Sequence, residues 1–463
     1  MKDFFIDPEG RNSELIKKIG YRIVDLIVEN LSDLKKKPIF RYKDPDELEK
    51  LFSEPIPEDP SDWDCLLDEI KEKILRYSFF FGHPRYIGHM ITQPSVPSIF
   101  LDSLISALNQ SLFLWEVGPA ATHLEREVIR WLTRLFGYGE ESGGMFLAGG
   151  SVANLSAMLI ARNLFISKGY DISKLTAISS DQSHFSLKKA ANFCAVRYAE
   201  VDTEEGKIKK DKLIRKIEEI RKEGYVPFFL CATAGTTISG SIDPIEEISE
   251  ICKKYGVWLH VDAAHGGAVI FSERYKGLLD GIELADSIAF DPHKWLYCSI
   301  PCATLLIKER SNLKHLLFKA PYARGGRPSQ GEASIQGTRS FDALKVWATL
   351  KLIGKKGIGK IVEHCIDMTK RLADIIKEKE ELELLNNPEI NILCFRYRSD
   401  DRVNEEIQKR LEKEGKAFLS VATFKGKRAL RAVILNFCTK EEDLSFVVDE
   451  VIRIGKKIEG GTI

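Results

Sequence analysis

The chain has 463 residues, and its 68 basic and 68 acidic side chains give a formal net charge of zero. A chain of this length is too long for one ordinary hydrophobic core, so two or three lobes are expected. The even charge balance, without a basic run beside aromatic residues, argues against a nucleic-acid-binding protein.

The sequence also lacks the features of a membrane or secreted protein. Residues 1–18 contain no signal-peptide apolar core, and no run of about 20 apolar residues could span a bilayer. Nine cysteines are scattered, with neither a CxxC motif nor a Cys/His ligand pattern. We therefore expect a cytoplasmic protein with reduced thiols, no membrane association and no metal site.

Residues 1–81 predict a helical segment at the start of the chain. Residues 12–31 have an amphipathic pattern, with Ser13 as N-cap and one apolar stripe formed by Leu15, Ile19, Ile23 and Ile27. A proline-punctuated connector follows. A segment this small cannot cover the stripe with its own residues, so we expect the stripe to pack on something else, such as a second subunit.

Two further regions follow. Residues 82–350 alternate short apolar strands with helical patterns, as a mostly parallel sheet requires. The expected strands are Met145–Ala148, Thr176–Ser179, Phe228–Ala232, Val257–Val261, Ser287–Phe290 and Thr304–Ile307. Residues 351–463 change to an α+β pattern, with strands at Ile392–Tyr397 and Leu430–Leu435 and a closing helix from Lys440. The expected fold class is α/β, with a helical segment, a large domain and a small α+β domain.

Two charged residues follow apolar strands of the large domain. Asp262 comes after Val257–Val261, and Lys294 comes shortly after Ser287–Phe290. Open α/β sheets bind ligands at the carboxyl ends of their strands. A carboxylate and a lysine at one sheet edge fit pyridoxal 5′-phosphate (PLP), because the amine forms a Schiff base with its aldehyde and the aspartate pairs with its pyridinium nitrogen.

A glycine-rich turn offers a place for the phosphate. The sequence AGGSVAN, residues 148–154, follows the first expected strand and precedes a helical pattern. The N-terminus of a helix presents free N–H groups and a positive dipole end to an anion. We therefore predict Gly150 and Ser151 as phosphate ligands.

The motifs HVDAA, residues 260–264, and DPHKW, residues 291–295, occur in an order and spacing that are highly specific. On these motifs the chain resembles the group II PLP-dependent amino-acid decarboxylases, which act on aromatic amino acids, glutamate, cysteine sulfinate or 2,4-diaminobutyrate. The resemblance covers nearly the whole chain. It implies the PLP-dependent transferase fold type I, conversion of an L-amino acid to an amine and CO2, and a homodimer with the active site at the subunit interface.

The resemblance also implies roles for further residues. His184 would stack on the cofactor ring opposite Asp262 and join Lys294 and Asp262 as a catalytic residue. Ala264 would let the ring lie close to its strand, and Thr237 would contact the cofactor.

Asp291 and His293 lie where the family binds phosphate. A carboxylate beside a phosphate dianion is electrostatically unfavourable, so we expect Asp291 to organise neighbouring donors.

The resemblance indicates a substrate class as well. In the segment GHPRYIGHMIT, residues 82–92, His89 stands where aromatic-specific members offer an aromatic ring. Thr92 joins it as a candidate for the substrate side chain, and Arg431 aligns with an arginine that faces the substrate carboxylate. These positions favour a polar aliphatic substrate, acidic or diamino, over an aromatic one.

One departure from the family leaves alternatives open. Many members carry a tyrosine that delivers the Cα proton on a loop that corresponds here to residues 323–339, which contain no tyrosine or phenylalanine. Tyr322, His184 and a water molecule are the candidate donors. Without a proton donor at Cα, the alternative function is an aldehyde synthase that releases peroxide. A third possibility is a catalytically silent PLP-binding subunit, but the presence of Lys294 and Asp262 argues against it.

Overall fold

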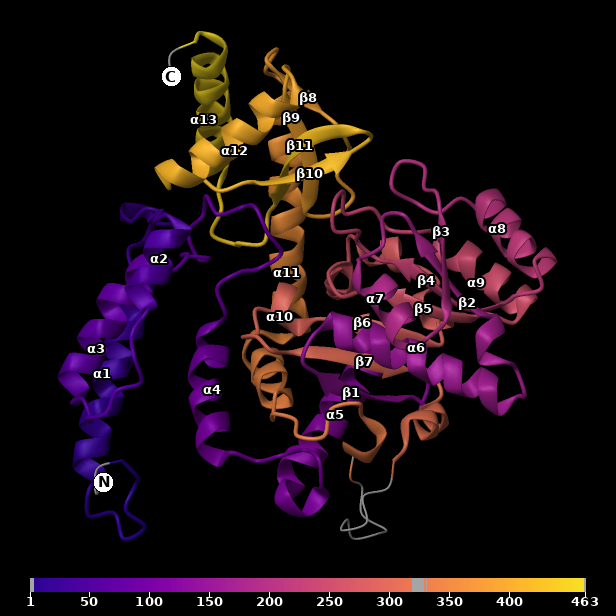
Figure 1. The fold of residues 1–463 in the computed structure, drawn as a ribbon, viewed down its shortest axis with the longest axis horizontal. Helices are drawn as coiled ribbons and strands as arrows, with labels where there is room; N and C mark the ends of the chain where they lie inside the picture. Colours follow the sequence, from indigo (N-terminus) through magenta and orange to yellow (C-terminus); the bar gives the residue numbers. More distant parts are fainter. Residues whose placement is uncertain (1–3, 319–328, 330, 462–463) are drawn as a thin grey trace.

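The computed structural model describes residues 4–318, 329 and 331–461. A helical arm lies at the side of a central sheet, and a C-terminal α+β region lies at one end of that sheet (Figure 1). The helices are α1 (Ser13–Leu31), α2 (Pro45–Phe52), α3 (Trp63–Glu69), α4 (Val96–Leu108), α5 (Pro119–Leu135), α6 (Gly150–Ser167), α7 (Ser186–Phe193), α8 (Lys210–Lys222), α9 (Ile245–Tyr255), α10 (Pro292–Trp295), α11 (Ala343–Lys377), α12 (Asp401–Glu414) and α13 (Glu441–Glu459). None of the helices in these residues is long and apolar enough to cross a membrane.

The N-terminal arm contains α1 to α3. Helix α1 forms where the apolar stripe predicted it, although Asn12 rather than Ser13 occupies the N-cap position. Of the stripe, Ile19 is buried, whereas Leu15 and Ile23 are exposed. Ile23 and Ile27 line an apolar pocket together with Trp63 of α3. The packing of the stripe on a second subunit stays a prediction.

The central sheet has seven strands in the order β1-β7-β6-β5-β4-β2-β3. They are β1 (Gly143–Leu147), β2 (Leu175–Ser180), β3 (Arg197–Val201), β4 (Val226–Thr233), β5 (Trp258–Asp262), β6 (Ser287–Phe290) and β7 (Ala303–Ile307). Strand β7 runs antiparallel to both of its neighbours, and the other neighbouring pairs are parallel. The predicted mostly parallel α/β sheet is confirmed, with β7 as its exception.

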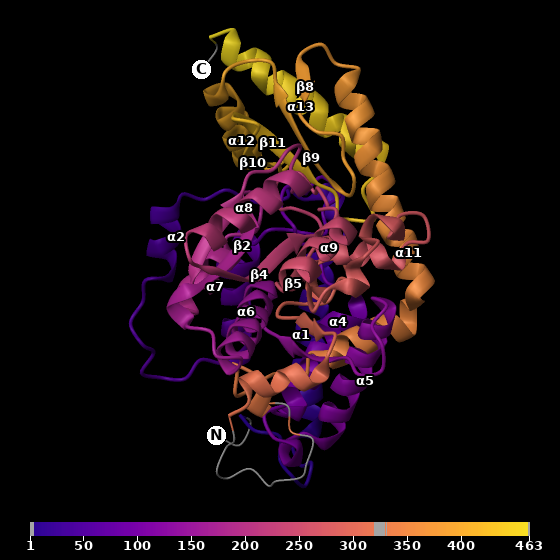
Figure 2. The ribbon, with the colours of Figure 1, turned by 90° about the vertical axis from the view of Figure 1, so that its right-hand side faces the viewer.

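Helices cover both faces of this sheet (Figure 2). On one face, α6 and α7 pack on Trp258 and other buried residues; on the opposite face, α5, α8 and α9 pack on residues that include Leu259 and Val261. Successive strand residues point to opposite faces, so a strand that is covered on both faces has buried side chains throughout, and all five residues of β5 are buried. His260 is the one polar residue before Asp262, which is the carboxylate at the end of the strand.

The C-terminal region contains an antiparallel sheet of order β10-β11-β9-β8, covered by α12 and α13. Its strands are β8 (Leu382–Leu384), β9 (Ile392–Tyr397), β10 (Ser420–Phe424) and β11 (Lys427–Val433). Helix α11 enters this region and bends at Gly354, which has a φ of 73°. The sequence-based division at residues 350 and 351 falls inside α11, and the three-domain division stays a prediction.

Candidate active site

The carboxyl ends of four parallel strands open into one cavity of about 290 Å³. The turns after β1, β4, β5 and β6 line it, and His184 enters from the turn after β2. All nine predicted cofactor residues lie in its wall: Gly150, Ser151, His184, Thr237, Asp262, Ala264, Asp291, His293 and Lys294. The structure thus brings together residues that are up to 144 positions apart, from Gly150 to Lys294 (294 − 150 = 144).

Asp262 is held as a hydrogen-bond acceptor at the end of β5. Its side chain is buried, its Oδ2 accepts from Nδ2 of Asn154 at 2.8 Å, and its Oδ1 accepts from the backbone N–H of Ala264 at 3.2 Å. Hydrogen bonds to both oxygens fix the orientation of the carboxylate. Asp262 can therefore offer a fixed negative charge to a cationic ring nitrogen.

A buried chain of hydrogen bonds lies behind Asp262. Burial lowers the pKa of His260 to about 4, so its imidazole is neutral near pH 7. Its Nε2 lies 2.9 Å from Oδ1 of Asn154, which can only accept, and so Nε2 carries the proton. Its Nδ1 therefore accepts from Oγ of Ser287 at 2.9 Å, and Ser287 in turn accepts from the indole N–H of Trp258. Every donor in this chain points toward Asn154.

Asn154 connects this chain to His184 as well. Its Nδ2 donates to Oγ of Ser186 at 3.0 Å, and that hydroxyl lies 2.8 Å from Nδ1 of His184. The backbone N–H of Ser186 also donates to Nδ1, so Nδ1 is an acceptor. Burial lowers the pKa of His184, which favours the neutral ring with its proton on Nε2. One asparagine thus fixes both the carboxylate of Asp262 and the tautomer of His184.

Lys294 lies in the short helix α10, which begins directly after Asp291. Its Nζ is 3.3 Å from Oδ2 of Asp291, and Nδ1 of His293 donates to the carbonyl oxygen of Cys302 at 2.7 Å. Oδ1 of Asp291 is buried and has no hydrogen-bond partner among the described residues. The Lys294 amine is thus held in the cavity by a carboxylate that keeps one oxygen available.

The N-terminus of α6 lies against this carboxylate. A Cβ at Gly150 would approach Oδ2 of Asp291 to 2.9 Å and Cβ of Ala264 to 3.2 Å, so the close approach requires glycine. The first N–H groups of a helix have no partner within the helix and attract an anion. The cavity therefore combines an amine, a fixed carboxylate and an anion cradle, which fit the aldehyde, the ring nitrogen and the phosphate of PLP.

Two groups in or next to the cavity were missed from the sequence. Asn154 could have been found, because it lies four residues after Gly150 and hence on the same face of α6. His265 gave no such signal. It lines the cavity, stacks on Trp295 at 5.1 Å and bonds Oδ1 of Asn391 at 2.8 Å through Nε2, and burial lowers its pKa to about 3.

The three predicted substrate residues lie outside this cavity wall. The buried Arg431 donates to the carbonyl oxygen of Thr237, which does line the cavity, at 2.7 Å. Its Nη2 lies 3.2 Å from Nδ1 of His89, which keeps a solvent-exposed part, and partial desolvation together with the charge of Arg431 lowers the pKa of His89. Thr92 is buried. Of residues 89–92, Met90 is the one that reaches the cavity, and the three substrate roles stay predictions.

The segment that carries His89 is positioned by the C-terminal region. The backbone N–H of Ile87 donates to the carbonyl oxygen of Phe418, and that of Val433 donates to the carbonyl oxygen of Ile87. Residues 86–88 therefore lie against the C-terminal sheet. Tyr322, the other candidate proton donor, lies outside the described residues.

Comparisons with known proteins agree with this geometry. A family model described as the pyridoxal-dependent decarboxylase conserved domain matches residues 45–398. The chain is 32% identical to the acidic amino acid decarboxylase GADL1 of Homo sapiens over 94% of this chain and 89% of that protein. It is 30% identical to the aromatic-L-amino-acid decarboxylase of Bacillus atrophaeus over 96% and 97%.

A solved structure is also similar over its full length. It is the glutamate decarboxylase domain of the diaminobutyrate-pyruvate transaminase and L-2,4-diaminobutyrate decarboxylase from Vibrio parahaemolyticus. The TM-score is 0.90 at 29% identity, and the match covers 98% of each chain.

Proposed function

The chain belongs to the pyridoxal-dependent decarboxylase family and is a PLP-dependent amino-acid decarboxylase, and we propose that its substrate is an L-amino acid with a polar aliphatic side chain, acidic before diamino. The observation that carries this proposal is the pair formed by Arg431 and His89 beside Thr237.

The direction of the hydrogen bond between these two residues distinguishes the two polar classes. Arg431 can only donate, so Nδ1 of His89 is the acceptor, and the lowered pKa of His89 keeps its ring neutral. The proton then resides on Nε2, which can donate to a carboxylate or sulfinate of the substrate. A side-chain ammonium would meet a donor there, next to the positive charge of Arg431.

We assign the cofactor-binding roles to the residues that line the cavity. Bound PLP supplies an electron sink for the pair released when the Cα–carboxylate bond breaks. Lys294 provides the amine for its aldehyde, and Asp262 holds the ring nitrogen protonated. Gly150 and Ser151 receive the phosphate at the N-terminus of α6, and Asp291 orients the Lys294 amine.

His184 is the proton donor at Cα that this geometry favours. Of the three candidates from the sequence, it is the side chain that the described residues bring to the cavity. Its Nε2 carries a proton because Nδ1 accepts from Ser186. Ser186 and Asn154 thereby keep a proton on Nε2. When Nε2 gives this proton to Cα, Nδ1 takes up the proton of the Ser186 hydroxyl, which recovers one from solvent, so the ring stays neutral.

A substrate screen tests the proposal. The panel holds aspartate, glutamate, cysteine sulfinate, 2,4-diaminobutyrate, ornithine and the aromatic amino acids, with CO2 and peroxide as readouts. We expect CO2 without peroxide and the highest kcat/KM for an acidic substrate. An aromatic preference would contradict the substrate assignment, and peroxide in step with CO2 would indicate an aldehyde synthase.

The variant His89→Phe links the screen to the site. It removes a donor to the charged group of the substrate, so kcat/KM for acidic substrates should fall by a factor that corresponds to about 1.5–3 kcal/mol, the usual contribution of a hydrogen bond to a charged group. Aromatic substrates should lose less or gain. His123→Phe, at an exposed histidine of α5, is the matched control. An unchanged ratio of acidic to aromatic turnover would remove His89 from the substrate subsite.

We also propose a homodimer with the active site near the subunit interface. Helix α4 presents an apolar stripe at i, i+4 spacing whose members are 64%, 38%, 46% and 47% exposed: Val96, Phe100, Leu104 and Leu108. Ser98 of the same helix bonds Ser299 at 2.9 Å, and the next residue, Ile300, lines the cavity while 60% exposed. Helix α4, which carries the exposed stripe, is thus bonded through its buried side to the loop that reaches the cavity.

Sedimentation velocity tests this assembly. Leu104→Glu should shift the dimer toward monomer and lower activity, because a charge replaces an apolar contact. Leu284→Glu, at a residue 44% exposed in another part of the large domain, is the matched control. A dimer of unchanged stability in Leu104→Glu would place the interface elsewhere. Deletion of residues 1–35 should give an aggregating or inactive protein, and a fully active monomer would contradict a role of the arm in assembly.

A further inference from the structure

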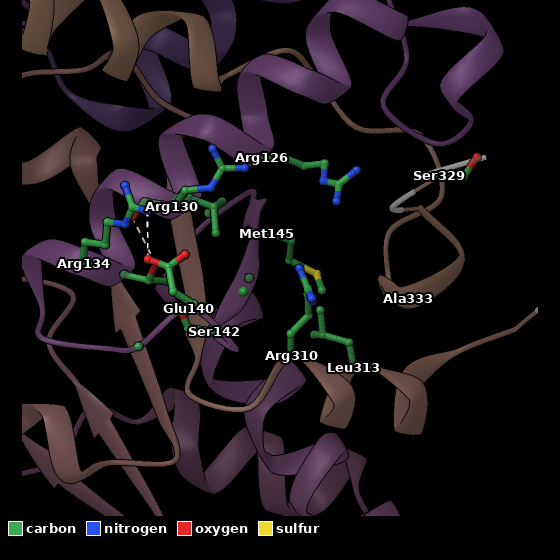
Figure 3. Close-up of a pocket in the computed structure, with 15 residues that line it drawn as sticks. Arg126, Arg130, Arg134, Glu140, Ser142, Met145, Arg310, Leu313, Ser329 and Ala333 are labelled. Atoms are coloured by element: carbon green, nitrogen blue, oxygen red, sulfur yellow. Dashed lines mark hydrogen bonds and ion pairs between the residues drawn. The ribbon is translucent and has the colours of Figure 1, made fainter. Parts of the chain in front are cut away.

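A second cavity, of about 240 Å³, concentrates positive charge at the opposite end of β1 (Figure 3). Four arginines and one glutamate are its charged residues, so its formal charge is 4 − 1 = +3 in a chain whose net charge is zero. They are Arg126, Arg130, Arg134, Arg310 and Glu140. We call this cavity the arginine pocket.

Helix α5 supplies three of the arginines from one face. Arg126, Arg130 and Arg134 follow at i, i+4 and i+8, a spacing that places like charges side by side and costs stability. Two of them have counter-charges: Arg130 pairs with Glu127, and Arg134 pairs with Glu140 at 2.8 Å.

Arg310 is fixed opposite this face by the backbone. Its N–H donates to the carbonyl oxygen of Glu141 at 2.8 Å. A Cβ at Gly143 would lie 2.9 Å from Cγ of Arg310, so the glycine makes room for the stem of the arginine. The stem of Arg310 is thereby positioned over the start of β1, and the residue is exposed.

Arg126 and Arg310 make no ion pair with any residue that the structure describes. Arg126 is half-buried, so its charge is partly removed from water without a counter-charge. The wall between the arginines is apolar, with Ile129, Met145 and Leu313. An unneutralised pair of guanidinium groups beside an apolar wall matches an organic anion whose oxygens can accept two parallel N–H bonds from each arginine.

We propose that the arginine pocket binds a small phosphate-bearing anion, at a site separate from the cofactor. The separation follows from β1: Gly143 to Met145 line the arginine pocket, and Ala148 to Gly150 line the cofactor cavity. With a strand rise of about 3.3 Å per residue, Gly143 and Ala148 lie roughly 16 Å apart. A phosphate group presents three oxygens and up to two charges, which two free arginines can neutralise.

Calorimetric titration of the holoenzyme tests this site. The cofactor is first fixed with borohydride, so that its own phosphate site is filled, and the probes are inorganic pyrophosphate and AMP at constant ionic strength. We expect both to bind, and the double variant Arg126→Gln/Arg310→Gln to weaken binding by at least about tenfold, because two charge-assisted contacts are lost. Arg402→Gln, at an exposed arginine of α12, is the matched control and should bind like the unmodified protein.

Several outcomes would overturn the proposal. One is the absence of binding by the unmodified holoenzyme at millimolar probe, and another is equal binding by the double variant. A third is dissociation of an assembled dimer in the double variant, because this would assign the arginines to contacts with a second copy of the chain. If the double variant does not fold, Arg310→Lys keeps the charge and the stem but loses the planar fork. It should still weaken binding, and unchanged affinity in this variant would exclude Arg310 from the site.

Discussion

The two cavities at the ends of β1 differ in whether their charged side chains have partners within the protein. In the cofactor cavity, Asp262 accepts two hydrogen bonds and Lys294 lies beside Asp291. In the arginine pocket, Arg126 and Arg310 make no ion pair within the described residues. The first site is preorganised, so its groups need little rearrangement when charge develops during the reaction. The second leaves neutralisation to a ligand.

The largest effect on turnover is expected from removal of the Asp262 carboxylate. Asp262→Ala removes the only charge proposed to hold the ring nitrogen protonated, so turnover should fall by at least about 10²–10³-fold, the range typical for loss of a preorganised electrostatic partner. Cofactor should be lost as well. Turnover and visible absorbance of the purified protein are the measurements, and Asp280→Ala, at an exposed aspartate, is the control. Normal cofactor content and turnover in Asp262→Ala would place the ring elsewhere.

A smaller effect on kcat/KM is expected from removal of Asn154, which donates a hydrogen bond to Asp262. Asn154→Ala leaves the Nε2–H of His260 unpaired and frees the carboxylate of Asp262, at a cost of about 1–3 kcal/mol. We expect kcat/KM to fall by roughly 10–100-fold and the pH profile of kcat to shift, because the Ser186 hydroxyl that contacts Nδ1 of His184 loses the hydrogen bond from Asn154 that orients it.

The control for this variant comes from the same helix. Asn163→Ala removes a hydrogen bond to the carbonyl oxygen of His315, away from the cavity. If both variants lower stability alike and neither shifts the pH profile, Asn154 has only a structural role.

The smallest effect concerns stability. The pKa of His260 is about 4 in the folded chain and about 6.5 when unfolded, so between these values only the unfolded chain binds the proton. This contribution to stability is complete above pH 6.5 and is lost on acidification toward pH 4. Asp243 acts in the opposite direction: burial raises its pKa to about 6, so its contribution falls as pH rises from about 4 to 6.

His260→Gln isolates the histidine contribution. Its amide can still donate to Asn154 but does not titrate, so the loss of unfolding free energy from pH 7 to pH 5 should be about 2 kcal/mol smaller than in the unmodified protein. Urea unfolding at the two pH values measures this difference. His123→Gln, at an exposed histidine, should leave the pH dependence unchanged, and an unchanged dependence in His260→Gln would mean that His260 is not neutral in the fold.

Much of the sheet was predictable because buried parallel strands leave a strong pattern. The segments that form β5 and β6 are mostly apolar and fully buried, with His260 and Ser287 as polar residues within them, and both form strands where expected. Strand β3, Arg197–Val201, was missed because it lies at the sheet edge and mixes exposed charged residues with partly buried ones. The antiparallel direction of β7 was missed because apolar runs carry no information on direction.

The site residues also fall into a group that was predictable from the sequence and a group that was not. Residues with a chemical signature, such as Lys294 after a strand and Gly150 in a glycine-rich turn, were predicted and lie together in one cavity. Asn154 and Ser186 act through hydrogen bonds between elements far apart in the chain, which depend on packing. The arginine pocket likewise needs the approach of Arg310 to α5, which no local pattern indicates.

Trapping of the cofactor tests the central assignment most directly. Borohydride reduces the Schiff base between PLP and its lysine to a stable secondary amine, and peptide mapping then identifies the modified residue. The geometry of the cavity, with Lys294 beside Asp291, predicts that the reduced adduct lies on Lys294 and is absent from Lys294→Ala. An adduct on any other lysine of the unmodified protein would contradict the account.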